Sequence, residues 1–380
     1  MPQHSSRKNG PPVRTVVEAL GVIAPTRLAA AWDNVGLLAG DLDASCGRVL
    51  LTIDMTPAVL AEARRLRSDM IVAYHPPIFR PIKTLRAQSN DTESLVYQAV
   101  SRGQAVYALH TALDAAKGGT NDVLADLCEL RDAVPFDDAR SPERRCKVVA
   151  FVPPGDATRV ADAMFAAGAG RIGEYEQCGF SQPGTGTFFG GPETQPAVGR
   201  KGRRESVDEL RLEVVCPAAR VGDVLVAIRA AHSYEEPAID VYPLTPEPII
   251  GAGMGRVGAL PKETTLSALA SRLKRKLKLP AIEVIGSPKR TVSTAAVCAG
   301  SAGRLPFESP RARGADVVVT GEIHHHDRLT YVRLGKAAVV LGHCNSERPV
   351  LPHVQDRLAA AVPKLTVRIA DADGPPAAWR

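Results

Sequence analysis

Short β-rich runs alternate with helical segments over most of this chain, and this alternation limits the fold more than any other feature. Residues 48–54, 70–74 and 105–109 are β-rich, and helical patterns lie between them at 57–66 and 93–102. Parallel strands need a long crossover connection, usually a helix, so the alternation predicts βαβ units. The predicted fold class is therefore α/β with a mainly parallel sheet.

A different pattern interrupts the alternation in the middle of the chain. Residues 134–145 are polar, charged and broken by two prolines, which indicates a linker. Strand, helix, a loop-rich stretch, strand, helix and strand follow, and this order is typical of a ferredoxin-like β-α-β-β-α-β unit. We therefore predict a discontinuous α/β domain at 13–143 and 248–380, interrupted by a ferredoxin-like α+β insert at 144–247.

The composition argues against membrane and secreted proteins. No run of about 20 apolar residues occurs, so we expect no membrane span. The polar segment Met1–Pro12 lacks the apolar core of a secretory signal, and we expect a short disordered tail there. The seven cysteines are scattered and include no CxxC pair, which fits reduced thiols and a cytoplasmic location.

The formal net charge of +6 raises the question of nucleic-acid binding. Basic residues at 272–278 alternate with leucines at helical spacing, which favours the exposed face of an amphipathic helix over a patch for polyanions. Aromatic residues make up only 4% of the chain, so a surface for stacking bases is not expected. Nucleic acid is therefore the least expected partner.

Histidines stand where four apolar strands are predicted to end. They are His75, His110, the run 324–326 and His343. The carboxyl ends of strands in a parallel α/β sheet line one crevice, so residues that are far apart in the sequence meet there. Imidazole is the commonest metal ligand among side chains. The pattern suits a metal site, although hydrogen-bonded structural histidines would give the same positions.

Two of these histidines are each followed, four residues later, by a carboxylate. The pairs are His110 with Asp114 and His343 with Glu347. On a helix this spacing places both side chains on one face, so each pair suits half of a metal site. We predict one or two divalent cations per subunit, and Zn, Mn, Fe, Ni or Co would suit mixed histidine and carboxylate ligands.

Other polar residues near the predicted site are assigned more limited roles. The triple histidine at 324–326 is expected to be a loop, with His326 the one residue that faces the site. His110 or His326 is predicted to act as the catalytic proton shuttle. Cys344 lies beside His343, and we expect it to be a buried, unreactive thiol.

Several motifs taken together resemble the Nif-three-like family, whose members are known as GTP cyclohydrolase I type 2 homologues. The motifs are Trp32-Asp33-Asn34-Val35-Gly36-Leu37, Tyr74-His75-Pro76-Pro77-Ile78-Phe79, His110-Thr111-Ala112-Leu113-Asp114-Ala115, Thr320-Gly321-Glu322 with His326-Asp327, and Gly342-His343 with Glu347. The insert resembles that family's middle domain, which is similar to PII and CutA trimer modules, at Ala167-Gly168-Ala169-Gly170 and Tyr234-Glu235-Glu236-Pro237. The resemblance implies a toroidal homohexamer, a trimer of dimers.

Carried over by position, the resemblance implies a two-metal site with His75, Asp114, His343 and the bridging Glu347 as ligands. The commoner family pattern has a second histidine directly before His75, and this chain has Tyr74 there instead. A phenol, with a pKa near 10, is a poorer ligand than imidazole. We therefore expect one firmly held cation at His75, His343 and Glu347, and a weaker position at Tyr74 and Asp114.

Two functions follow from this prediction. The first is a metal-dependent hydrolase that acts on a nucleotide or a related small molecule through metal-activated water. The family's name suggests GTP ring opening, although the chain contains no guanine-recognition motif. The alternative is a metal-handling or regulatory hexamer without catalysis.

Overall fold

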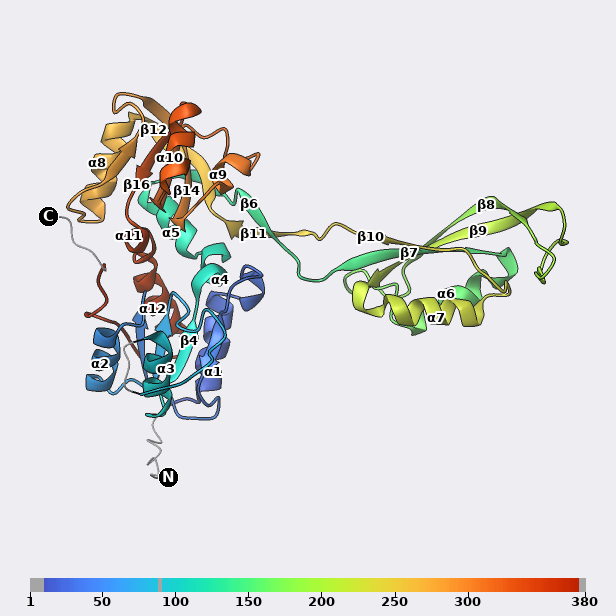
Figure 1. The fold of residues 1–380 in the computed structure, drawn as a ribbon, viewed down its shortest axis with the longest axis horizontal. Coiled ribbons are helices and arrows are strands. Elements are labelled where there is room, and N and C mark those ends of the chain that lie inside the picture. Colours follow the sequence, from blue (N-terminus) through green and yellow to red (C-terminus); the bar gives the residue numbers. More distant parts are fainter. Residues whose placement is uncertain (1–9, 88–90, 376–380) are drawn as a thin grey trace. The chain divides into compact units, whose positions relative to one another are not determined.

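The computed structural model of the protein describes residues 10–87 and 91–375. Within these ranges the chain divides into two units, one with the residues up to Ala139 and from Ile249 on, the other with Arg140–Pro248 (Figure 1). Most of the predicted N-terminal tail lies outside the described ranges. None of the described helices is long and apolar enough to cross a bilayer.

The first sheet of the larger unit has five strands in the order β1-β4-β3-β2-β17. Three neighbouring pairs are parallel, and β1 runs antiparallel to β4. The strands are β1 (Gly36–Ala39), β2 (Arg48–Thr52), β3 (Met70–Ala73), β4 (Ala105–Ala108) and β17 (Thr366–Ile369). The helices of this part are α1 (Val13–Ile23), η1 (Thr26–Leu28), α2 (Pro57–Arg65), α3 (Thr92–Val100), α4 (His110–Ala115) and α12 (Val350–Ala361).

Helices cover both faces of this sheet, and this explains why β2 and β3 are apolar at successive positions. Leu51 and Val72 pack into a core with residues of α1 and α12. Leu50 and Ile71, one position earlier in each strand, pack into a second core with residues of α2 and α3. Side chains alternate across a strand, so a sheet buried on both faces needs continuous apolar runs.

The second sheet of the larger unit has six strands in the order β13-β16-β15-β14-β12-β5. The strands are β5 (Arg131–Val134), β12 (Arg256–Thr265), β13 (Glu283–Ile285), β14 (Thr291–Ser301), β15 (Val317–Glu322) and β16 (Ala337–Val340). The helices are α5 (Thr120–Leu127), α8 (Leu266–Lys276), α9 (Leu305–Glu308), α10 (His325–Arg333) and α11 (His343–Glu347). As predicted, α8 buries its leucines (Leu266, Leu269 and Leu273) and exposes most of its basic residues.

Both sheets are mixed, which corrects the prediction of a mainly parallel sheet. Only the pairs of β15 with β14 and with β16 are parallel in the second sheet, whereas β5, β12 and β13 run antiparallel to their neighbours. These antiparallel strands contain many polar residues and glycine. They therefore lack the continuous apolar run by which buried parallel strands are recognised.

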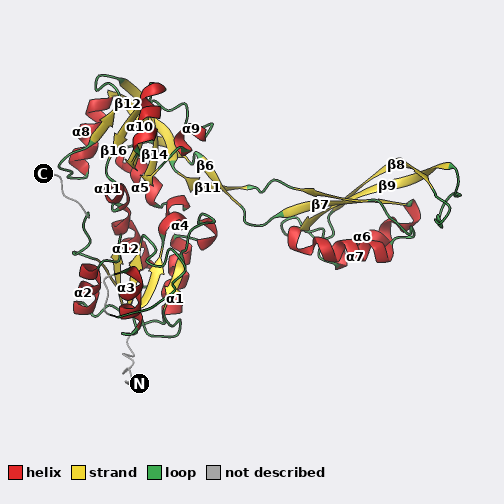
Figure 2. Cartoon of the chain, in the orientation of Figure 1, coloured by secondary structure: helices red, strands yellow, loops and turns green. Residues whose placement is uncertain are grey.

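The smaller unit has the element order β-α-β-β-α-β. Its elements are β7 (Arg145–Val152), η2 (Pro154–Asp156), α6 (Ala157–Ala166), β8 (Gly179–Phe189), β9 (Arg204–Pro217), η3 (Ala218–Arg220), α7 (Val221–Ala231) and β10 (Ile239–Pro243). All neighbours in the sheet, β10-β7-β9-β8, are antiparallel. Helices α6 and α7 share one core with a face of this sheet (Figure 2).

Two stretches that the sequence analysis assigned to loops are strands. Residues 179–189, within the loop-rich part of the insert, form β8. The predicted linker contains β6 (Asp137–Arg140), which pairs with β11 (Pro248–Met254) where the chain returns from the smaller unit.

Candidate metal centre

The predicted ligands lie at the carboxyl ends of strands from both sheets of the larger unit. His75 follows β3, His343 begins α11 just after β16, and Glu347 ends α11. One ligand atom from each of these three residues lies within 4.8 Å of the other two. The structure therefore brings together a histidine and a His-x-x-x-Glu pair that are far apart in the sequence.

Glu347 is the centre of this triad. Its Oε1 lies 3.1 Å from His343 Nε2, and its Oε2 lies 3.4 Å from His75 Nε2. The helical spacing of His343 and Glu347 places both on one face of α11, as predicted. A Cβ added at Gly300 would come within 2.6 Å of Glu347 Oε1, so only glycine leaves room for the carboxylate.

The triad suits a divalent cation. The side chain of Glu347 is 4% exposed, and its Oε2 has no hydrogen-bond partner within the described ranges. Oε2 faces His75 Nε2 at 3.4 Å without a hydrogen bond, so it is open to a cation that would bind both residues. Two imidazoles and one carboxylate are also the three protein ligands typical of catalytic zinc sites, which keep further positions open.

Two further carboxylates orient the imidazoles of the triad. Asp54 Oδ1 lies 3.0 Å from His75 Nδ1, and Glu322 Oε1 lies 3.3 Å from His343 Nδ1. Both contacts leave Nε2 of each ring directed at Glu347. Such carboxylates fix the ring orientation and raise the basicity of metal-binding histidines. Neither carboxylate was predicted to contact the site, although Asp54 ends the β-rich run 48–54 and His75 follows the run 70–74.

The triad is charged in the absence of a cation. Burial opposes ionisation of Glu347, but His343 and His75 outweigh it and lower the pKa of the carboxyl group. Burial also opposes protonation of His75, but Asp54 and Glu347 outweigh it and raise its pKa to about 10. The hydrogen bond to Glu347 raises the pKa of His343 as well. Metal binding therefore competes with protonation of His75.

We expect metal affinity to increase with pH across the neutral and alkaline range. Protons on His75 compete with the cation until the pH passes about 10, so affinity gains up to about tenfold per pH unit for each proton released. When a chelator removes the metal, the stability of the folded protein changes with pH in the opposite direction. The stability that protonated His75 contributes is complete below its usual pKa of 6.5 and is lost as the pH rises through about 10.

Two titrations check this pH dependence. Competition with a metal indicator at pH 6, 7 and 8 measures the affinity, and thermal unfolding in chelator at the same values measures the stability. An affinity that stays constant over this range would contradict a site in which histidines carry the displaced protons.

Tyr74 and Asp114 are bonded to each other beside the triad. The fully buried Tyr74 hydroxyl donates a hydrogen bond to Asp114 Oδ1. Burial, and then the charge of Asp114, raises the pKa of Tyr74 well above its usual value. Burial, and then the charge of Glu347, raises the pKa of Asp114 to about 6. The hydrogen bond between them occupies two of the atoms that the predicted second position would use.

His110 forms a dyad with Asp33. Asp33 Oδ1 lies 2.8 Å from His110 Nδ1, and Asp33 Oδ2 accepts hydrogen bonds from the amide and hydroxyl of Thr111. Burial raises the pKa of Asp33, but His110 and Thr111 outweigh it, so the pKa is lowered. The His110 and His75 ring centroids are 5.3 Å apart, which places the dyad beside the triad. The sequence analysis gave Asp33 no role.

Two exposed aromatic rings border the dyad. Trp32 is 64% exposed, and its ring centroid lies 5.8 Å from that of His110. Phe79 is 50% exposed and meets Trp32 edge to face at 6.0 Å. Asn34 Nδ2 donates to the carbonyl oxygen of Ile78 at 2.6 Å, which joins the two segments that carry the rings.

The remaining predicted residues lie elsewhere. His326 is exposed in the first turn of α10, where its ring packs on that of His325, so the triple histidine partly forms a helix and not a loop. His326 is not part of the cluster of ligand atoms found among the described residues. Cys344 is buried and burial raises the pKa of its thiol, as expected for an unreactive cysteine.

Comparisons with known proteins place the whole chain in one family. The Duf34/NIF3 (NGG1p interacting factor 3) family profile matches residues 11–375. The chain is 35% identical over 345 residues, 91% of each protein, to a GTP cyclohydrolase 1 type 2 homolog from Halalkalibacterium halodurans. It is 36% identical over 337 residues, 88% of each protein, to one from Mycobacterium tuberculosis.

A solved structure extends this similarity to the fold. The crystal structure of a Bacillus cereus protein related to NIF3 superposes with a TM-score of 0.66 at 33% identity, and the match covers 97% of this chain and 99% of that one. The family match spans the metal-site residues as well as the smaller unit. The chain therefore belongs to the Duf34/NIF3 family.

Proposed function

We propose that this protein is a metal-dependent hydrolase that acts on a nucleotide or a related ring-containing small molecule. The buried triad of His75, His343 and Glu347, with one carboxylate oxygen left without a hydrogen bond, carries the proposal. A divalent cation bound there would polarise a substrate oxygen and lower the pKa of water. Proton transfer and substrate placement then fall to residues beside the triad.

The His110–Asp33 dyad is the proposed proton acceptor. Asp33 holds the Nδ1 side of the ring, so Nε2 is the nitrogen that takes a proton from the attacking water. The lowered pKa of Asp33 keeps its carboxylate charged, and this charge stabilises the imidazolium that forms. Thr111 fixes Asp33 through two hydrogen bonds, which keeps the dyad in one orientation.

The exposed rings of Trp32 and Phe79 support a substrate with a planar ring. Stacking of aromatic side chains on nucleobases contributes about 1–3 kcal/mol of binding free energy per base and depends little on which base is bound. These rings border the dyad, so a base held there would lie next to the proton acceptor. Because the curated relatives are called GTP cyclohydrolase 1 type 2 homologs, GTP is the first substrate to test.

Replacing Asp33 by asparagine is expected to lower kcat about 10- to 100-fold, because His110 loses the charge that orients it and stabilises its protonated form. Metal content should stay unchanged, since Asp33 does not contact the triad ligands. Steady-state kinetics with parallel metal analysis checks both expectations. Loss of metal together with activity would show that Asp33 serves the metal site instead.

The proposed activity is tested by incubating metal-loaded protein with GTP, other nucleotides and simple phosphoesters. Product formation is followed by mass spectrometry, which separates ring opening from phosphate release. We expect one class of substrate to turn over and the Glu347→Ala variant to be inactive. Absence of turnover on every substrate, or equal turnover by the variant, would contradict the proposal.

A regulatory assembly without catalysis is the second candidate. The bond between Tyr74 and Asp114 favours it, because that bond opposes the second metal ion of a two-metal mechanism. The hexameric assembly implied by the family resemblance belongs to this proposal, with the smaller unit as the PII/CutA-like module. It predicts a hexamer by light scattering and metal-dependent partner binding without turnover.

A further inference from the structure

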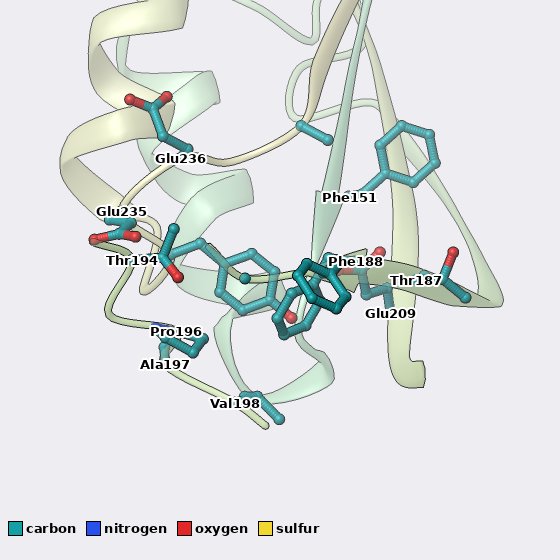
Figure 3. A pocket seen from close by; sticks show the side chains of 15 residues that line it. Phe151, Thr187, Phe188, Thr194, Pro196, Ala197, Val198, Glu209, Glu235 and Glu236 are labelled. Atoms are coloured by element: carbon teal, nitrogen blue, oxygen red, sulfur yellow. The ribbon is translucent and has the colours of Figure 1, made fainter. Parts of the chain in front are cut away.

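The smaller unit contains a cavity of its own, with a volume of about 470 Å³. It lies between β8 on one side and the loop 194–198 on the other (Figure 3). Aromatic residues are only 4% of the chain, yet four of them line this one cavity: Phe151, Phe188, Phe189 and Tyr234. A cavity of this size with an aromatic lining suits a small ligand.

Three glutamates line the cavity, and Glu209 is the least exposed of them. Glu209 is half-buried on β9, and a Cβ added at Gly186 on β8 would come within 2.1 Å of its Oε2. The carboxylate therefore lies directly over the glycine, in space that only glycine leaves open. Glu209 also accepts a hydrogen bond from Tyr234, whose pKa is raised to about 12 by burial and by that charge.

No basic side chain lines the cavity in the described part of the chain, and Glu209 forms no ion pair there. The nearby Arg211 is bound to Glu213 and lies against the lining ring of Phe151. Its Nε donates to Glu213 Oε1 at 2.7 Å, while its guanidinium lies 5.6 Å from the ring centroid of Phe151. The charge of Glu209 is therefore left for a ligand.

Hydrogen bonds hold the walls of the cavity in place. Glu235 Oε1 accepts from the amide of Gln195, which fixes the loop 194–198. The buried His232 lies 3.0 Å from the carbonyl oxygen of Phe151 through Nε2, and its Nδ1 accepts from the amide of Tyr234. A lining that is already ordered costs less conformational entropy when a ligand binds.

We propose that this cavity binds a small organic ammonium ion, with its apolar body among the aromatic rings and its charge at Glu209. Aromatic faces attract cations, and a half-buried carboxylate gives such a cation a charged hydrogen-bond acceptor. The proposal does not depend on the metal centre, since every residue that it uses belongs to the smaller unit.

The test uses phenethylamine and its uncharged analogue phenethyl alcohol, titrated into the full-length protein and followed by calorimetry. We expect the amine to bind and the alcohol to bind at least about tenfold more weakly, as the loss of a charged hydrogen bond implies. Glu209→Gln should weaken amine binding by a similar factor. Glu174→Gln is the matched control and should change little, because this glutamate of the smaller unit is exposed and does not line the cavity.

Gly186→Ala provides an independent variant that keeps every charge. Its methyl group would displace the Glu209 carboxylate, so amine binding should fall while the melting temperature stays close to that of the unchanged protein. Equal binding of amine and alcohol, or amine binding unaffected by Glu209→Gln, would overturn the proposal. Failure of both probes to bind would overturn it too, whether the cavity is empty or filled by a second copy of the chain.

Discussion

Replacing Glu347 by alanine is expected to weaken divalent-metal binding at least about 100-fold. Zinc sites with four ligands bind with about 10–16 kcal/mol, so one ligand accounts for about 3 kcal/mol, or about two powers of ten. Glu347 is the only carboxylate of the triad, so its removal leaves two imidazoles to hold the cation. Competition titrations with Zn²⁺ and Mn²⁺ measure the change.

A matched control separates loss of a ligand from loss of charge. Glu308 is an exposed glutamate on α9 of the same unit, and Glu308→Ala should leave metal affinity unchanged. The Glu347→Ala variant should remain folded in chelator, because its two histidines can then lose their protons. Metal affinity that survives the removal of Glu347 would place the cation elsewhere.

Replacing Tyr74 by histidine is expected to raise the metal content from one to two cations per chain. The change substitutes an imidazole for a phenol that keeps its proton, and it releases Asp114 from its hydrogen bond. Asp114, whose pKa is raised to about 6, is ionised above that pH and can then serve as a ligand. Metal analysis after equilibration with excess Zn²⁺ and gel filtration measures the stoichiometry.

Tyr74→Phe is the control for this gain. It removes the hydroxyl and keeps the ring, so it frees Asp114 without adding a ligand. We expect one cation in this variant and a lower melting temperature, because the buried Asp114 carboxylate loses a hydrogen bond. One cation in both variants would show that the second position lacks more than an imidazole.

The sequence correctly predicted the helices that bury one apolar stripe and the strands that are apolar at successive positions. The helical pattern at 57–66 corresponds to α2, which ends one residue earlier, and the leucine stripe of α8 is buried. The strands β8 and β12 were not recognised. β8 is an edge strand with mostly exposed residues, and β12 is an antiparallel strand with several exposed residues, so both tolerate glycine, proline and charged residues.

Only those site residues whose type is uncommon in the chain could be predicted from the sequence. Histidine is uncommon, so His75 and His343 at strand ends stood out, and the helical spacing then added Glu347. Asp54 and Glu322 act only through hydrogen bonds to these imidazoles. Carboxylates follow many strands, so the sequence alone cannot select these two. The bond between Tyr74 and Asp114 is likewise a matter of three-dimensional distance.

Metal analysis of the protein purified without added metal tests the central claim most directly. The comparison is between the unchanged chain and His343→Ala, measured by inductively coupled plasma mass spectrometry and normalised to protein concentration. The structure predicts close to one equivalent of a divalent transition metal in the unchanged chain and almost none in the variant. Metal-free unchanged protein that also fails to take up Zn²⁺ or Mn²⁺, or equal metal in both proteins, would contradict a site at His75, His343 and Glu347.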